Sequence, residues 1–141
     1  MNKKIVILII ICFLLGGCGK GVKEITIEDF KQVCTDNNLL FMNEEIDKTN
    51  NTSICSLVNG NITMTIYDSA KKAKKESKNN IDKMNEEMSK DSKISNKNGK
   101  YVMESDLYYM INLRVDNTII YASSTSDDKD IIDKIFREIG Y

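Results

Sequence analysis

Residues 107–124 read LYYMINLRV-DN-TIIYASS, and this stretch decides the fold. Two apolar, partly β-branched runs flank Asp116-Asn117, residue types that tolerate the left-handed backbone of a two-residue hairpin loop. A loop at this position sets three cross-strand pairs on one apolar face: Val115 with Thr118, Leu113 with Ile120, and Ile111 with Ala122. The alternation and the loop therefore agree on one register for an antiparallel hairpin.

The spacing of apolar residues also predicts strands and helices on both sides of this hairpin. The further predicted strands are 39–42, 54–58, 62–67 and 100–104, with the turn Asn59-Gly60-Asn61 forming a second hairpin. The predicted helices are 25–37, about 68–89, and 127–139. The polar segment 44–51 is predicted to be a loop, and the polar segment 90–97 is assigned no element.

The helices carry recognisable end signals. Thr26 and Asp29 match a capping box, and Asp68 or Ser69 can cap the long helix. Gly140 follows the last helix, where a glycine commonly closes the C-terminus. The long helix has a narrow apolar stripe at helical spacing: Ala70, Ala73, Ser77, Ile81, Met84 and Met88. Hairpins together with helices predict an α+β domain, an antiparallel sheet built from two hairpins plus short strands, with three helices packed mainly on one face.

The N-terminal residues have the composition of a bacterial export signal. Lys3 and Lys4 precede the unbroken apolar run 5–15, and Gly16, Gly17 and Cys18 follow at once. As a helix, the run would rise only about 16 Å, against a hydrocarbon core of roughly 30 Å. It therefore fits a signal peptide better than a membrane span.

The four residues Leu15-Gly16-Gly17-Cys18 resemble the lipobox of bacterial lipoproteins. The resemblance implies that the Cys18 thiol receives a diacylglyceryl group and that residues 1–17 are removed. Residues 18–24 would then be a lipidated tether of at most about 20 Å, and 25–141 a single globular domain. The expected location is the extracytoplasmic face of the cell membrane, with the membrane as partner through the lipid on Cys18. An ordinary cleaved signal or an uncleaved anchor is the alternative.

Composition narrows the possible chemistry. The chain has no His, Trp or Pro, so triads and zinc sites that need histidine cannot be built. Without Lys3 and Lys4, the remaining basic residues are slightly outnumbered by the 21 acidic ones, which does not suggest nucleic-acid binding. No cofactor is expected. An enzyme with a carboxylate or tyrosine centre remains a third class of function.

Removal of the signal, with lipidation of Cys18, leaves Cys34 and Cys55 as a pair. Outside the cell a disulfide between them can persist, closing a loop of about 20 residues worth roughly 3 kcal/mol. Two separately buried thiols are the alternative.

Two surfaces are candidates for binding. Tyr108, Asn112, Arg114 and Tyr121 fall on the sheet face opposite Ile111 and Leu113, and such residue types are favoured at interfaces. A partly solvent-exposed sheet face that binds no ligand would have the same sequence pattern. The long helix carries Lys71, Lys72, Lys74, Lys75 and Lys78, which suit anionic lipid or wall polymer, or simply form a solvated face.

Two groups of residues resemble metal ligands, but both are better explained by structural roles. The methionines, among them Met64, Met84 and Met110, are at core spacing, so they are more often packing residues than soft-metal ligands. Asp127, Asp128 and Asp130 lack the glycine and distal glutamate of a calcium loop, and helix-end electrostatics account for them. No metal is expected.

The expected function is therefore a non-catalytic module that binds a ligand or a surface-protein partner through the tyrosine-bearing face. The alternative is an anionic lipid or wall-polymer contact through Lys71–Lys78.

Overall fold

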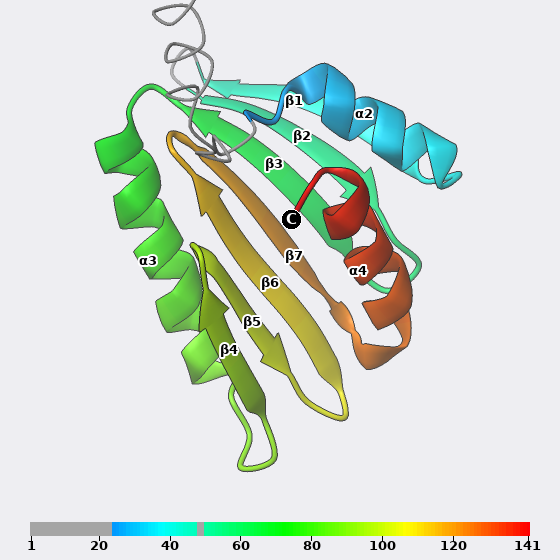
Figure 1. The fold of residues 1–141 in the computed structure, drawn as a ribbon, viewed down its shortest axis with the longest axis vertical. Coiled ribbons are helices and arrows are strands. Elements are labelled where there is room, and N and C mark those ends of the chain that lie inside the picture. Colours follow the sequence, from blue (N-terminus) through cyan, green and yellow to red (C-terminus); the bar gives the residue numbers. More distant parts are fainter. Residues whose placement is uncertain (1–23, 48–49) are drawn as a thin grey trace, which may run out of the picture.

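The computed structural model describes residues 24–47 and 50–141, which form one seven-stranded antiparallel sheet with three α-helices (Figure 1). The sheet order is β1-β2-β3-β7-β6-β5-β4. The strands are β1 (Leu40–Asp47), β2 (Asn50–Ser56), β3 (Asn61–Tyr67), β4 (Lys93–Lys97), β5 (Lys100–Glu104), β6 (Tyr108–Val115) and β7 (Thr118–Thr125). The helices are α2 (Ile27–Asp36), α3 (Ala70–Glu86), the 3₁₀ turn η1 (Ser126–Asp128) and α4 (Lys129–Glu138).

The predicted α+β class is confirmed, and so is the register of the deciding hairpin. β6 and β7 pair Val115 with Thr118, Leu113 with Ile120, and Ile111 with Ala122. Asp116 has a φ of 50°, as a tight two-residue loop requires. This hairpin lies at the middle of the sheet, so its register positions the strands on both sides.

The helices divide between the two faces of the sheet. α2 and α4 cover one face, where Phe30, Phe136 and Ile132 pack on strand residues that include Ile62 and Ile111. α3 lies on the opposite face, where Met84 packs with Tyr101, Met103 and Met110. The expectation of helices mainly on one face therefore describes α2 and α4 but not α3. Its stripe of small residues, with Ala73 and Ser77 buried, lets α3 approach the sheet closely.

The predicted loop 44–51 is wrong, and the unassigned segment 90–97 contains a strand. β1 extends to Asp47 and pairs with a β2 that begins at Asn50, and β4 occupies 93–97. β1 and β4 are the two edges of the sheet. Edge strands pair through their backbone on one side and tolerate polar side chains, so neither carries an apolar alternation.

Helix ends follow the predicted signals. Thr26 and Asp29 form the capping box of α2, and the Ser69 hydroxyl accepts the Lys72 backbone N–H at the start of α3. After α4, Gly140 adopts a φ of 100°. The Gly140 and Tyr141 N–H groups then donate to the carbonyls of Arg137 and Phe136, which completes a Schellman motif.

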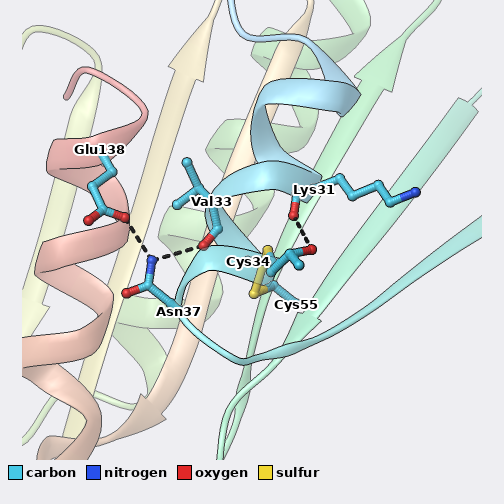
Figure 2. The surroundings of a disulfide bond; sticks show 7 residues. Lys31, Val33, Cys34, Asn37, Cys55 and Glu138 are labelled. Carbon is cyan, nitrogen blue, oxygen red and sulfur yellow. Dashed lines mark hydrogen bonds between the residues drawn. A yellow bond between two sulfur atoms is a disulfide. The ribbon is translucent and has the colours of Figure 1, made fainter.

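A disulfide joins Cys34 on α2 to Cys55 on β2, with the two Cα atoms 5.9 Å apart (Figure 2). Both cysteines are fully buried in the main core. Beside them, the Asn37 side-chain amide donates to the Val33 carbonyl and to the Glu138 carboxylate at 2.8 and 2.7 Å. α2 is therefore fastened covalently to β2 and by a hydrogen bond to α4.

Candidate functional site

The outer side of α3 presents a row of lysines. Because Ala73, Ser77 and Met84 face the sheet, Lys71, Lys74, Lys75 and Lys78 point away from it and are exposed. None of these four ammonium groups forms an ion pair or hydrogen bond among the described residues. Lys72 differs, since it lies 3.9 Å from the Asp68 carboxylate. Glu76 lies within this run of lysines in the sequence, but its carboxylate accepts a hydrogen bond from the Asn79 side chain.

The lysine-bearing half of α3 lies at the end of the molecule where the described chain begins. Tyr67, just before α3, exchanges two hydrogen bonds with Asn117 in the β6–β7 turn, at 2.9 and 3.0 Å. Glu24 and Ile25 line the same groove as this turn. Figure 1 shows the starts of α2 and α3 and the β6–β7 turn at one end of the sheet. The described chain therefore begins at the same end of the sheet as the lysine-bearing half of α3, but on the opposite face, where Ile25 packs in the core beneath α2 and α4.

The tyrosine-bearing sheet face is not the open surface expected. Asn112 is fully buried under α3, where its amide donates to the Ser77 hydroxyl at 2.8 Å and accepts from Asn80 at 3.1 Å. Tyr101 on the same face donates to Asn85 at 2.6 Å. A polar side chain that bonds a covering helix gives the same sequence pattern as one that faces water, so the pattern did not reveal α3.

The other three residues of that predicted face are separated. Tyr121 is half-buried against Met110, and the Arg114 guanidinium donates to the Asp116 carbonyl at 3.2 Å. Tyr108 is 41% exposed, at the opposite end of β6 from Arg114. Tyr108, Asn112, Arg114 and Tyr121 therefore form no single ligand surface.

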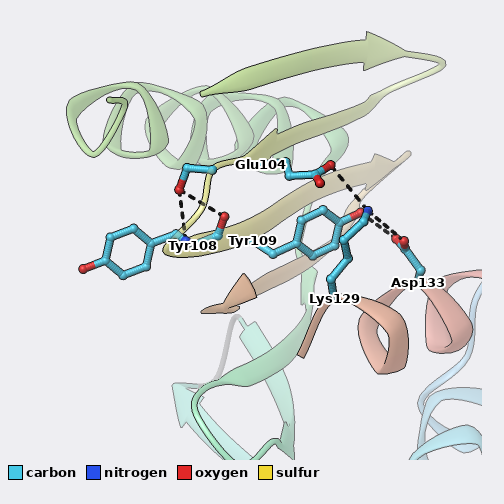
Figure 3. Close-up of polar contacts among 6 residues, drawn as sticks. Glu104, Tyr108, Tyr109, Lys129 and Asp133 are labelled. Carbon is cyan, nitrogen blue, oxygen red and sulfur yellow. Dashed lines mark hydrogen bonds and ion pairs between the residues drawn. The ribbon is translucent and has the colours of Figure 1, made fainter. Parts of the chain in front are cut away.

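A cluster of polar side chains, one of them a tyrosine with a raised pKa, links α4 to the sheet (Figure 3). Tyr109 donates to Asp133 at 2.6 Å, and the Lys129 ammonium lies 3.1 Å from Asp133 and 3.5 Å from Glu104. Burial, together with the hydrogen bond to Asp133, raises the pKa of Tyr109 to about 12. A tyrosine base or nucleophile would need a lowered pKa, and every charge here has a partner, so the cluster fits a structural role.

We expect the free energy of unfolding to fall as the pH rises from 10 to 12. Unfolded Tyr109, with a pKa near 10, releases its proton before the folded residue does, which favours the unfolded state by up to about 2–3 kcal/mol. Below pH 10 Tyr109 contributes no such dependence. Urea denaturation across this range checks the expectation, and Tyr109→Phe should flatten the curve. An equally steep fall in that variant would contradict it.

The remaining candidates have structural environments. Asp128 is buried and accepts the Asn59 N–H at 3.1 Å and the Ser124 hydroxyl, which fastens the β2–β3 turn. Met64 lies in the main core and Met84 and Met110 lie beneath α3. Within residues 24–47 and 50–141, no group of three or more Cys, Asp or Glu side chains is arranged to hold a metal ion.

The predicted signal peptide 1–17, Cys18 and most of the predicted tether lie outside the described residues. Among the helices that are described, none combines the length and apolar character needed to cross a membrane. Comparison of the chain with protein-family models, curated proteins and solved structures finds no match.

Proposed function

We propose that this protein is a lipid-anchored, extracytoplasmic, non-catalytic module that contacts an anionic surface through the outer lysines of α3. The anchor is the lipid on Cys18, and the contact is to anionic lipid headgroups or wall polymers. The observation that carries the proposal is that four lysines without a partner among residues 24–47 and 50–141 lie at the end of the sheet where the described chain begins.

The geometry makes this contact physically reasonable. A tether of at most about 20 Å keeps this end of the domain near the bilayer. Lysines near an anionic membrane contribute about 1 kcal/mol each, and the attraction decays within a Debye length of about 8–10 Å. Lysines at the start of α3 would then be closer to the bilayer than lysines at the opposite end of the sheet, so the proposal assigns the contact to them.

The anchor is tested by changing Cys18. We expect Cys18→Ser to abolish the mature, lipid-modified form, because the serine hydroxyl cannot replace the thiol as the acceptor. Intact-mass spectrometry of membrane fractions measures this directly. Cys12→Ser, a matched change within the signal peptide, should leave lipidation intact. A lipidated, membrane-bound Cys18→Ser protein would exclude the proposed anchor.

Binding of a surface protein is the second candidate, favoured by the β5–β6 turn. Leu107 and Tyr108 are 69% and 41% exposed there, at the end of the sheet opposite the start of α3. In-cell crosslinking followed by mass spectrometry should then recover one stoichiometric partner, linked near this turn. Recovery of lipid or wall fragments alone would favour the lysine contact instead.

A further inference from the structure

A groove opens at the same end of the molecule, at the end of the sheet bordered by the β4–β5 turn, the β6–β7 turn and the residues after α4. Its rim is formed by the β4–β5 turn, the β6–β7 turn and the C-terminal Gly140 and Tyr141. Glu24 and Ile25 also line it. The groove is therefore adjacent to the point where the tether would join the domain.

The β4–β5 turn is held rigidly against β6. Asn98 and Gly99 have φ values of 51° and 78°, and the Gly99 carbonyl accepts the Arg114 N–H at 3.1 Å. A Cβ on Gly99 would lie 2.9 Å from the Arg114 carbonyl oxygen, so a side chain there meets both a steric and a conformational barrier. The turn and Arg114 are thus positioned as a unit.

Three cations line this groove. Lys97 and Lys100 are direct cross-strand partners on either side of the turn, an arrangement that like charges normally disfavour. The Arg114 guanidinium donates one hydrogen bond to the Asp116 backbone carbonyl. In the described part of the chain, none of the three has a carboxylate within ion-pair distance, although Glu24 and Asp116 also line the groove.

Lys100 is the most constrained of the three. Its side chain is partly buried, and its ammonium lies 4.8 Å from the centre of the Phe136 ring. Burial lowers the pKa of Lys100, while Asp133, beyond ion-pair distance, opposes this. A cation held at this position with no ion-pair partner among the described residues gains most from an anion in the groove.

We infer that the groove binds a phosphate group, that of an anionic lipid headgroup beside the anchor, through Lys97, Lys100 and Arg114. The lipid as source rests on the proposed anchor, because only a membrane-tethered domain holds this groove against headgroups. An arginine and two lysines around one turn match a phosphate, which offers several acceptor oxygens.

The test measures the acetylation rate of each lysine in the full, lipidated chain. The protein is placed in nanodiscs of phosphatidylglycerol or of phosphatidylcholine, whose choline group cancels the phosphate charge. We expect acetylation of Lys100 to slow about tenfold in phosphatidylglycerol, the factor that one charge-assisted hydrogen bond contributes. Arg114→Gln should remove most of this protection, whereas Lys134→Gln, a matched loss of charge on the outer side of α4, should retain it.

Separate rates for each lysine distinguish the two claims. Slowing at Lys71, Lys74, Lys75 and Lys78 without slowing at Lys100 overturns the groove and supports the α3 contact. Slowing at Lys100 alone supports the groove and overturns that contact. Slowing at neither overturns both. Protection of Lys100 by inorganic phosphate on phosphatidylcholine discs, with none from phosphatidylglycerol, supports the phosphate site but overturns lipid as its source.

Discussion

Changing Lys71, Lys74, Lys75 and Lys78 to glutamine is expected to weaken binding of residues 19–141 to phosphatidylglycerol vesicles by up to roughly 1,000-fold. The expectation follows from about 1 kcal/mol per lysine near an anionic surface, with 1.4 kcal/mol corresponding to tenfold. The four side chains are exposed and have no partner among the described residues, so no folded-state contact is lost. Vesicle co-sedimentation measures the change in affinity.

The matched control changes four exposed lysines elsewhere: Lys83, Lys90, Lys93 and Lys134. Both variants lose the same formal charge, so a difference between them reports position and not net charge. The control is expected to bind within a few-fold of the unchanged chain, because its lysines lie away from the start of α3. Equal losses in the two variants would mean that only overall charge matters, which would contradict a specific surface on α3.

Reduction of the Cys34–Cys55 disulfide is expected to lower the free energy of unfolding by about 3 kcal/mol, and the melting temperature by about 10 °C. The bond closes a loop with a sequence separation of 21 and fastens α2 to β2. Its loss frees the unfolded chain and loosens the packing of α2 beside Phe30 and Phe41. Thermal unfolding with and without reductant measures the effect.

Cys34→Ala/Cys55→Ala serves as the control for this experiment. That variant should melt near the temperature of the reduced protein and should not respond further to reductant. An unchanged melting temperature on reduction of the unmodified chain would show that the bond contributes little to stability.

The central part of the fold was predictable because several local signals agree there. In the β6–β7 hairpin the apolar alternation and the two-residue loop specify one register, and the structure has that register. The capping box at Thr26 and the glycine at 140 likewise set their helix ends by local backbone chemistry. The part of edge strand β1 beyond the predicted 39–42, and the whole of edge strand β4, were not predicted because backbone pairing to one neighbour imposes no pattern on their side chains.

The sequence shows which residue types the candidate sites contain, but it does not show how the fold arranges them. The lysine run on α3 is visible in the sequence, but its position beside the chain entry depends on the Tyr67–Asn117 contact, which spans 50 residues. The face with Asn112 was misassigned because a buried amide that bonds Ser77 resembles a solvated one in sequence. The groove brings together turns from two hairpins and the C-terminus, so no local motif marks it.

The most direct test of the central claim is the salt dependence of binding between residues 19–141 and phosphatidylglycerol vesicles. These residues lack Cys18 and therefore the proposed lipid, so any attraction must come from the domain itself. We expect clear binding at low salt, a steep loss as salt shortens the Debye length, and no binding to phosphatidylcholine vesicles. Salt-independent binding, or no binding to either vesicle at low salt, would contradict an anionic-surface contact by this protein.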